Sequence, residues 1–267
     1  QAIAILDSGV GGLTVAKEIM RRLPEEQVLY FGDTGRAPYG SRPPSEVVTY
    51  TKQMVDFLLT LQPKMIVIAC NTATATALET IREVSPVPVV GVIYPGARQS
   101  IRLTKSRRIG VIGTEATIRS GAYDKVLKEL CPDVHVTSLA CPQFVPLVEQ
   151  GKYRTKEAER IVRETLKPLA HADMDCLILG CTHYPFLSEF IAAAMGSGVT
   201  LIHSADETAK DVGEILRSEG LANPGTRQEE HRFFCSGDPR MFASIAAKWL
   251  GQPVQVTQVT LIDSIIR

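Results

Sequence analysis

Two stretches of this sequence share one pattern: residues 65–71 read Met-Ile-Val-Ile-Ala-Cys-Asn, and residues 176–182 read Cys-Leu-Ile-Leu-Gly-Cys-Thr. Each begins as a short apolar run without polar alternation, which is typical of a strand buried on both faces of a parallel sheet. Each then ends in a cysteine followed by a polar residue. The pattern predicts two equivalent strands that deliver Cys70 and Cys181 to their carboxyl ends.

Similar apolar runs alternate with helical patterns through the first half of the chain. In order, we expect strand 3–6, helix 13–23, strand 28–31, helix 45–61, strand 65–69, helix 73–84 and strand 87–93, the last ending at Tyr94-Pro95-Gly96. Regular alternation of strand and helix predicts an α/β fold whose parallel sheet is covered on both faces.

The second half of the chain repeats this plan. Residues 109–114 follow residues 3–8 at an offset of 106, 134–137 follow 28–31 at 106, 176–182 follow 65–71 at 111, and 199–203 follow 89–93 at about 110. Four strands in one order at a nearly constant offset predict two similar α/β lobes. The cysteine that ends the third strand in both halves is the most informative of these matches.

The last 60 or so residues fit neither repeat. They predict a helix near 206–219, a strand at 231–235, a helix near 239–250 and a strand at 254–259. We expect this tail to return and complete the first lobe. The predicted domains are therefore residues 1–95 with 207–267, and residues 96–206.

Composition excludes several classes of protein. The chain has 267 residues, of which 45% are hydrophobic, and its 29 basic residues balance its 29 acidic ones. A chain with no net charge has no global field to attract nucleic acid or an anionic membrane. No stretch approaches the ~18 consecutive apolar residues of a spanning helix. The six cysteines form no C-x-x-C pair, which argues against a disulfide framework or a zinc ribbon and favours a reducing, cytoplasmic setting.

Reactive side chains gather at the carboxyl ends of the predicted strands, where parallel sheets bind ligands. These ends read Asp7-Ser8-Gly9, Asp33-Thr34, Cys70-Asn71-Thr72, Thr114-Glu115 and Cys181-Thr182-His183. Two lobes that face each other across a cleft would present Cys70 and Cys181 to one ligand from opposite sides. Such a pair suits stereoinversion, because one group removes a Cα proton from one face and the other returns a proton to the opposite face.

A thiol needs an activator for this chemistry, since its ordinary pKa is about 8.5. Asp7 is placed to assist Cys70, and His183 is placed to assist Cys181. The helices that follow these strands direct unpaired N–H groups toward the same edge, where they can hold a carboxylate.

Other interpretations of these residues stay open at the level of sequence. A buried cysteine is usually inert packing, Asp7 suits a helix N-cap, and His183 suits a core histidine. Residues 9–14 begin like a dinucleotide fingerprint, but Thr14 stands at the third glycine position. A zinc ion shared by Cys181 and His183 lacks an evident third ligand, and no lysine stands at a strand end for a pyridoxal cofactor.

Two functions from other classes also remain. A non-catalytic two-lobed amino-acid binding module would share the double crossing between lobes, although it needs no thiols. A thiol hydrolase would use Cys181 as nucleophile and His183 as base, although it leaves Cys70 unexplained.

Four motifs together resemble the bacterial glutamate racemases. They are Asp7-Ser8-Gly9-Val-Gly-Gly, Pro38-Tyr39-Gly40, Cys70-Asn71-Thr72-Ala73 and Gly180-Cys181-Thr182-His183-Tyr184-Pro185. The likeness runs over essentially the whole chain and preserves the order and spacing of the motifs. Gly-Cys-Thr alone would also admit aspartate and hydantoin racemases, whereas Cys-Asn-Thr-Ala and Thr-His-Tyr-Pro favour glutamate.

The resemblance implies a fold and a reaction. It implies two α/β lobes related by a pseudo-twofold axis, with the active site in the cleft between them, and it implies assembly as a homodimer. It implies interconversion of L- and D-glutamate without pyridoxal phosphate, metal or other cofactor, and use of the D-glutamate in peptidoglycan synthesis. Glutamate is the expected partner, with no nucleic acid and no membrane.

The resemblance also implies roles for individual residues. Cys70 would deprotonate D-glutamate and Cys181 would deprotonate L-glutamate, assisted by Asp7 and His183 respectively, with Glu149 as a further catalytic candidate. The expected substrate-binding residues are Asp7, Ser8, Tyr39, Gly40, Ser41, Asn71, Thr72, Thr114, Thr117, Thr182 and His183.

Overall fold

The computed structural model describes residues 1–226 and 229–261 of the chain. Contacts between Cα atoms divide it into two units, each with its own parallel sheet. Unit 1 combines Gln1–Val92 with the described residues from Ala205 onward, and unit 2 is the continuous segment Ile93–Ser204. The two units are described in turn.

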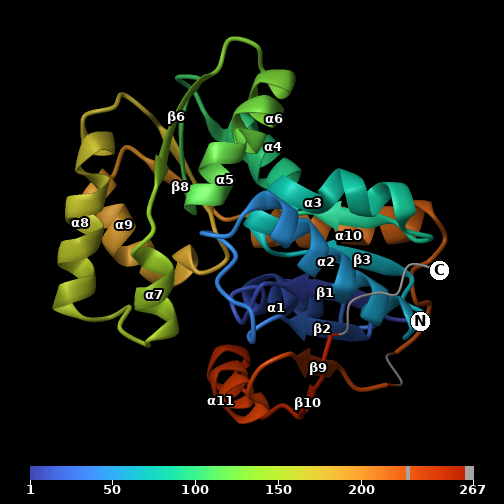
Figure 1. The fold of residues 1–267 in the computed structure, drawn as a ribbon. Helices are drawn as coiled ribbons and strands as arrows, with labels where there is room; N and C mark the ends of the chain where they lie inside the picture. Colours follow the sequence, from blue (N-terminus) through green and yellow to red (C-terminus); the bar gives the residue numbers. More distant parts are fainter. Residues whose placement is uncertain (227–228, 262–267) are drawn as a thin grey trace. The chain divides into compact units, whose positions relative to one another are not determined.

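Unit 1 is built on a parallel sheet with the strand order β10-β9-β2-β1-β3-β4 (Figure 1). Its strands are β1 (Ile3–Asp7), β2 (Val28–Gly32), β3 (Met65–Ile68), β4 (Val89–Gly91), β9 (Arg232–Cys235) and β10 (Val256–Gln258). The first three are buried at every residue, which explains their unbroken apolar sequences. The C-terminal strands β9 and β10 extend this sheet beyond β2.

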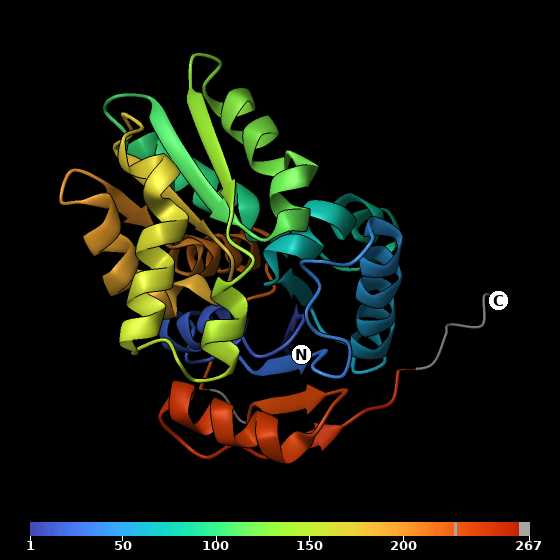
Figure 2. The same ribbon diagram turned by 60° about the vertical axis from the view of Figure 1, so that its left-hand side comes forward.

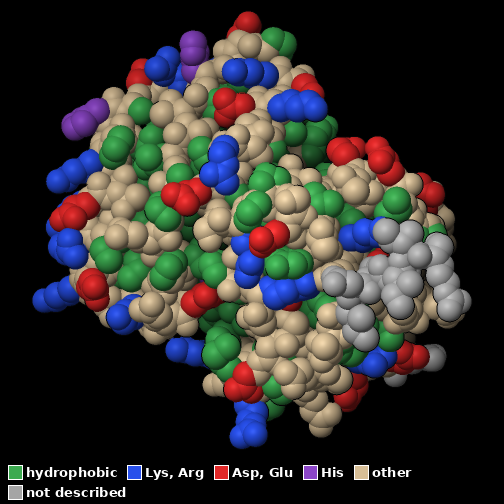
Figure 3. Space-filling view, viewed as in Figure 1, with side chains coloured by type: hydrophobic (Ala, Val, Ile, Leu, Met, Phe, Trp, Pro, Cys, Tyr) green, Lys and Arg blue, Asp and Glu red, His purple; other side chains and the backbone are tan. Residues whose placement is uncertain are grey.

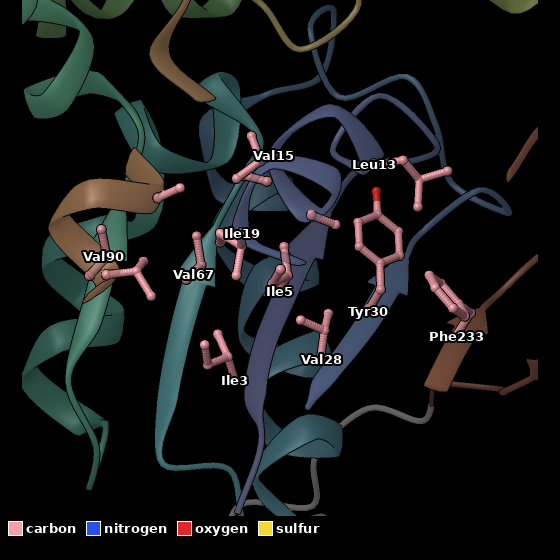
Figure 4. Packing of buried hydrophobic residues seen from close by; sticks show 14 of the residues in the cluster. Ile3, Ile5, Leu13, Val15, Ile19, Val28, Tyr30, Val67, Val90 and Phe233 are labelled. Atoms are coloured by element: carbon pink, nitrogen blue, oxygen red, sulfur yellow. The ribbon is translucent and has the colours of Figure 1, made fainter. Parts of the chain in front are cut away.

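Helices cover both faces of the unit 1 sheet. They are α1 (Leu13–Arg22), α2 (Pro44–Leu59), α3 (Asn71–Val84), α10 (Ser204–Ser218) and α11 (Pro239–Leu250). One apolar cluster, part of which is shown in Figure 4, joins α1, α10 and α11 to the sheet through residues such as Ile19, Val212 and Phe242. A second cluster joins α2 and α3 to the opposite face through Met54 and Ala77.

Unit 2 is built on a parallel sheet with the strand order β6-β5-β7-β8. Its strands are β5 (Arg108–Gly113), β6 (His135–Ala140), β7 (Cys176–Gly180) and β8 (Thr200–Ile202). Its helices are α4 (Ile93–Leu103), α5 (Glu115–Ser120), α6 (Ala122–Leu130), α7 (Phe144–Glu149), α8 (Lys156–Ala170), the 3-10 turn η1 (Tyr184–Leu187) and α9 (Ser188–Met195). Within this unit α4 packs against α6, and α8 packs against α9 (Figure 2).

The same strand order recurs in both units. Strands β2-β1-β3-β4 of unit 1 correspond in sequence to β6-β5-β7-β8 of unit 2, at the offsets noted above. Every strand pair in the two sheets is parallel. The predicted α/β fold with parallel sheets is confirmed.

One predicted boundary is wrong. The sequence predicts a strand over 87–93 that ends at Tyr94-Pro95-Gly96, but β4 stops at Gly91 and α4 begins at Ile93. Pro95 is tolerated there because N–H groups in the first turn of a helix have no partner within the helix. Gly96 suits the packing of this turn, since a Cβ at that position would lie 3.1 Å from Cβ of Ser204.

Surface charge and helix hydropathy agree with the composition. Among the described residues, no helix has both the length and the hydropathy needed to cross a lipid bilayer. On the face drawn in Figure 3, basic and acidic side chains are interspersed in both units, without a large patch of one sign.

Candidate active site

Cys70 occupies the N-cap of helix α3, directly after the third strand of unit 1. Its Sγ accepts a hydrogen bond from the backbone N–H of Ala73 at 3.4 Å, and the residue is 6% exposed. The N-terminus of a helix favours negative charge, because its first N–H groups point outward along the helix dipole. Asn71 and Thr72, both predicted to bind substrate, form the first turn of α3 and are also buried.

Asp7 ends strand β1, next to the strand that leads to Cys70. Leu6 pairs with Ile68 in the neighbouring strand β3, so the two strand ends lie side by side. The Asp7 side chain is fully buried, and its Oδ2 accepts a hydrogen bond from the N–H of Gly9 at 3.0 Å. The N-cap of α1 is Gly12, not Asp7, so the N-cap interpretation of Asp7 is wrong.

Tyr39 lies in the loop between β2 and α2 and is only 1% exposed. Its hydroxyl donates a hydrogen bond to the Asp33 carboxylate. Burial and the charge of Asp33 raise the pKa of Tyr39 well above its usual range, so the hydroxyl remains a donor. Gly40 is half-buried and Ser41 is exposed.

Asp33 connects this loop to the C-terminal part of unit 1. Besides Tyr39, its carboxylate accepts hydrogen bonds from Arg36 Nε at 2.8 Å and from Ser236 Oγ at 2.5 Å. Ser236 follows strand β9, which neighbours β2 in the sheet. Sequence reasoning placed Asp33 at a strand end but missed this network, because Ser236 lies 203 residues away.

Cys181 follows strand β7 of unit 2 and is the first member of a chain of three polar groups. Its Sγ lies 3.7 Å from Nδ1 of His183, and Nε2 of His183 lies 3.2 Å from Oε1 of Glu149 at the end of α7. Cys181 is 7% exposed and His183 is 4% exposed, whereas the Glu149 side chain is 35% exposed. His183 is therefore buried, but it contacts a thiol and a carboxylate rather than only core side chains.

The electrostatics of this chain favour a protonated histidine. Burial by itself would lower the pKa of His183, but its hydrogen bonds to Cys181 and Glu149 and their negative charges outweigh that effect. Together they raise the pKa of His183 to about 10. At neutral pH an imidazolium therefore lies beside the Cys181 sulfur.

Three other buried cysteines have raised pKa values. Burial raises the pKa of Cys141 to about 12 and that of Cys176 to about 11, and it also raises the pKa of Cys235. These residues therefore stay protonated at neutral pH. None of the six cysteines forms a disulfide in the described part of the chain.

Three threonines border Cys181 in unit 2. Gly113 of β5 pairs with Gly180 of β7, so Thr114 and Cys181 extend from neighbouring strand ends. Thr114 is the N-cap of α5, where its Oγ1 accepts a hydrogen bond from the N–H of Thr117 at 3.2 Å. Thr182 Oγ1 lies 3.5 Å from Nδ1 of His183.

The predicted site residues thus form two groups, one in each unit. Asp7, Ser8, Cys70, Asn71 and Thr72 lie at the strand ends of unit 1, with Tyr39, Gly40 and Ser41 in the following loop; Thr114, Thr117, Cys181, Thr182, His183 and Glu149 lie in unit 2. In the range that the structure describes, no group of three or more His, Cys, Asp or Glu side chains is placed to hold a metal ion.

Replacing Glu149 by glutamine is expected to lower the pKa of His183, because it removes a negative charge 3.2 Å from Nε2. The imidazolium would then lose its proton at lower pH, and the alkaline limb of the pH–rate profile would move to lower pH as well. We expect turnover at pH 8 to fall about tenfold. Proton NMR titration of the imidazole, assigned with a His183→Asn variant, measures the shift. An unchanged titration would show that Glu149 does not set the charge of His183.

Each α/β unit has a cysteine at a strand end, with Asp7 on the neighbouring strand in unit 1 and His183 beside the thiol in unit 2. This arrangement suits the class of racemases, which move a proton on and off carbon. The comparisons agree with this class. The model of the Asp/Glu/Hydantoin racemase family matches residues 12–212. The chain belongs to this family and is an isomerase.

Individual relatives extend the match to nearly the full length. The glutamate racemase of Bacillus cereus is 51% identical over 96% of this chain and 95% of that protein. The crystal structure of the Bacillus anthracis glutamate racemase isoform RacE1 covers 98% of both chains at 46% identity, with a TM-score of 0.95. A Francisella tularensis glutamate racemase, solved with D-glutamate, also covers 98% of both chains, at 35% identity and a TM-score of 0.91. The resemblance to glutamate racemases is confirmed.

Proposed function

We propose that this protein interconverts L- and D-glutamate by moving the Cα proton between Cys70 and Cys181. The Cys181–His183–Glu149 chain is the observation that carries the proposal, because it places a protonated base against a buried thiol. The equivalent cysteine of unit 1, at the N-cap of α3, supplies the second proton carrier. The high identity to glutamate racemases supports glutamate as the substrate.

In the proposed reaction, Cys70 as thiolate removes the proton from Cα of D-glutamate. The Cα–H bond breaks, an S–H bond forms on Cys70, and the electron pair remains on the substrate as a carbanion. Cys181 as thiol then delivers its own proton to the opposite face, which forms L-glutamate and leaves a Cys181 thiolate. The reverse reaction begins from that state. The proposal therefore requires both thiols to reach opposite faces of one Cα.

The residues beside each sulfur have complementary tasks in this proposal. The His183 imidazolium, a cation, stabilises the Cys181 thiolate. Asp7 assists proton transfer at Cys70. Hydrogen-bond donors stabilise the carbanion by holding the α-carboxylate, onto which its charge spreads. The first turn of α3, with Asn71 and Thr72, supplies such donors in unit 1. Ser8, Thr114, Thr117 and Thr182 complete the proposed binding set, with Gly40 and Ser41 in the loop after Tyr39.

We further propose that the enzyme works as a cytoplasmic homodimer whose D-glutamate is used for peptidoglycan synthesis. The resemblance to bacterial glutamate racemases supports this part of the proposal. We also propose that residues 1–95 with 207–267, and residues 96–206, act as the two catalytic domains.

Proton NMR in deuterated water tests the activity directly. L-glutamate and D-glutamate are incubated separately with the protein, a thiol reductant and a chelator, without pyridoxal phosphate. We expect both enantiomers to lose the Cα proton signal, and aspartate to react much more slowly. Full retention of both signals with folded, reduced protein would overturn the proposal for glutamate. Faster exchange with aspartate would assign the chain to that substrate instead.

A further inference from the structure

Tyr30 is a buried tyrosine beneath the Cys70 side of the site, and the proposed reaction gives it no role. It lies in strand β2 and is fully buried. Its ring packs against Phe242 and Phe233, with centroid separations of 5.8 and 6.4 Å. Figure 4 shows the ring projecting from the sheet with its hydroxyl toward Leu13, at the start of α1. The Tyr30 hydroxyl is therefore a polar group within an otherwise apolar cluster.

The Tyr30 hydroxyl is one link in a short chain of hydrogen bonds to Asp7. It donates to the carbonyl oxygen of Gly9 at 2.9 Å. The N–H of the same glycine donates to Oδ2 of Asp7 at 3.0 Å. Gly9 is thus held on both sides, by Tyr30 through its carbonyl and by Asp7 through its amide. A glycine without these restraints has more backbone freedom than any other residue.

Gly12 shows how closely these groups are packed. A Cβ at this position would lie 2.8 Å from the Tyr30 hydroxyl oxygen and 2.5 Å from Cβ of Asp7. The tyrosine hydroxyl and the Asp7 side chain therefore both pack closely against Gly12, just before the start of α1. Burial and the charges of Asp7 and Cys70 raise the pKa of Tyr30 well above its usual range, so the hydroxyl keeps its proton.

We propose that Tyr30 is a positioning residue for the Cys70 side of the reaction. Its hydroxyl fixes the Gly9 carbonyl, and Gly9 in turn fixes the Asp7 carboxylate that assists Cys70. This inference rests on the proposed function, since it assumes that Asp7 and Cys70 act on the substrate. Removing the hydroxyl leaves the Gly9 carbonyl without its donor and lets the Asp7 carboxylate shift.

Rates alone cannot show which cysteine is affected. Racemisation has an equilibrium constant of one, so any variant must lose the same fraction of kcat/KM in both directions. Isotope effects do separate the two proton transfers. Deuterium at Cα of D-glutamate is removed by Cys70 in the proposed reaction, whereas deuterium at Cα of L-glutamate is removed by Cys181.

The decisive variant is Tyr30→Phe, which keeps the ring contacts with Phe233 and Phe242 and is expected to fold. Misplacing a group that assists proton transfer typically costs about 10- to 100-fold, and we expect kcat/KM to fall by that factor in both directions. Because transfer at Cys70 becomes the slower step, the isotope effect on kcat/KM should rise with D-[2-²H]glutamate and fall with L-[2-²H]glutamate. Tyr94→Phe, at a tyrosine that is 49% exposed, is the matched control. It should leave both kcat/KM and the isotope effects unchanged.

A double-mutant cycle with Asp7→Asn adds a second readout. If Tyr30 acts through Asp7, its loss should have little further effect in the Asp7→Asn background. Isotope effects that stay unchanged from the parent for both enantiomers, or fully additive losses, in a variant whose circular dichroism matches that of the parent would overturn the proposal. Cys70→Ala separates this failure from that of the proposed function. An active Cys70→Ala enzyme contradicts the two-cysteine reaction, whereas an inactive one with a normal Tyr30→Phe enzyme contradicts only the role of Tyr30.

Discussion

Replacement of either Cys70 or Cys181 by alanine is expected to reduce inversion of glutamate by at least about 10²- to 10⁴-fold, the usual contribution of one acid–base group. Each substitution removes a proton carrier from one face of Cα and leaves the other in place. Both residues are small and lie at the ends of buried strands, so alanine preserves the fold. Circular dichroism at the absorption of glutamate follows inversion from each enantiomer.

Exchange of the Cα proton with deuterated water shows which cysteine acts on which enantiomer. The Cys181→Ala variant keeps Cys70, so any remaining exchange should be confined to D-glutamate, and the Cys70→Ala variant should show the opposite preference. Cys131→Ala, at the end of α6, serves as a control and should retain normal turnover. Near-normal inversion in either active-site variant would remove that cysteine from the reaction.

The Lys64→Met variant is expected to lose about 3–5 kcal/mol of unfolding free energy, because it breaks a buried ion pair. Nζ of Lys64 lies 2.6 Å from Oε2 of Glu26, and their side chains are only 5% and 1% exposed. Nζ also donates to the carbonyl of Leu221, and Oε1 of Glu26 accepts from the N–H of Asn223 at 2.8 Å. The ion pair therefore links the segment after α10 to the residues that precede strands β2 and β3.

Urea unfolding of the parent and variant proteins measures this loss. Lys52→Met, at an exposed position of α2, is the matched control and should change stability by less than about 0.5 kcal/mol. Adding Glu26→Gln to Lys64→Met should recover part of the loss, since the uncompensated charge is then removed. A Lys64→Met variant as stable as the parent would contradict a stabilising role for this ion pair.

Much of the fold could be predicted because its strands are short, apolar and buried on both faces. The runs at 3–6, 28–31 and 65–69 leave little choice of structure, and the cysteines that follow two equivalent strands point to their carboxyl ends. The start of α4 could not be read in the same way, because Tyr94-Pro95-Gly96 suits a turn as well as a first helical turn. Local sequence cannot distinguish a turn from a first helical turn. The close packing of Gly96 against Ser204 does distinguish them, and it depends on residues far apart in sequence.

Individual side-chain contacts of the candidate site could be predicted where neighbours in sequence are neighbours in space. His183 lies two residues from Cys181, so its contact with the thiol follows from their spacing. The partners of Tyr39 and Tyr30 do not, since a hydroxyl hydrogen bond depends on side chains from other elements. The hydrogen bond from Ser236 to Asp33 joins residues 203 positions apart, and neither local sequence indicates this contact.

Unit 1 is interrupted in sequence, whereas unit 2 is continuous. A ribosome therefore finishes all of unit 2 before it makes strands β9 and β10, which occupy one edge of the unit 1 sheet. Ser236, which donates a hydrogen bond to Asp33 and so helps to hold the loop of Tyr39, is also made after unit 2. During synthesis the Cys181 side is free to reach its native structure first, and the Cys70 side is completed only after β9 and the Ser236 segment have been made.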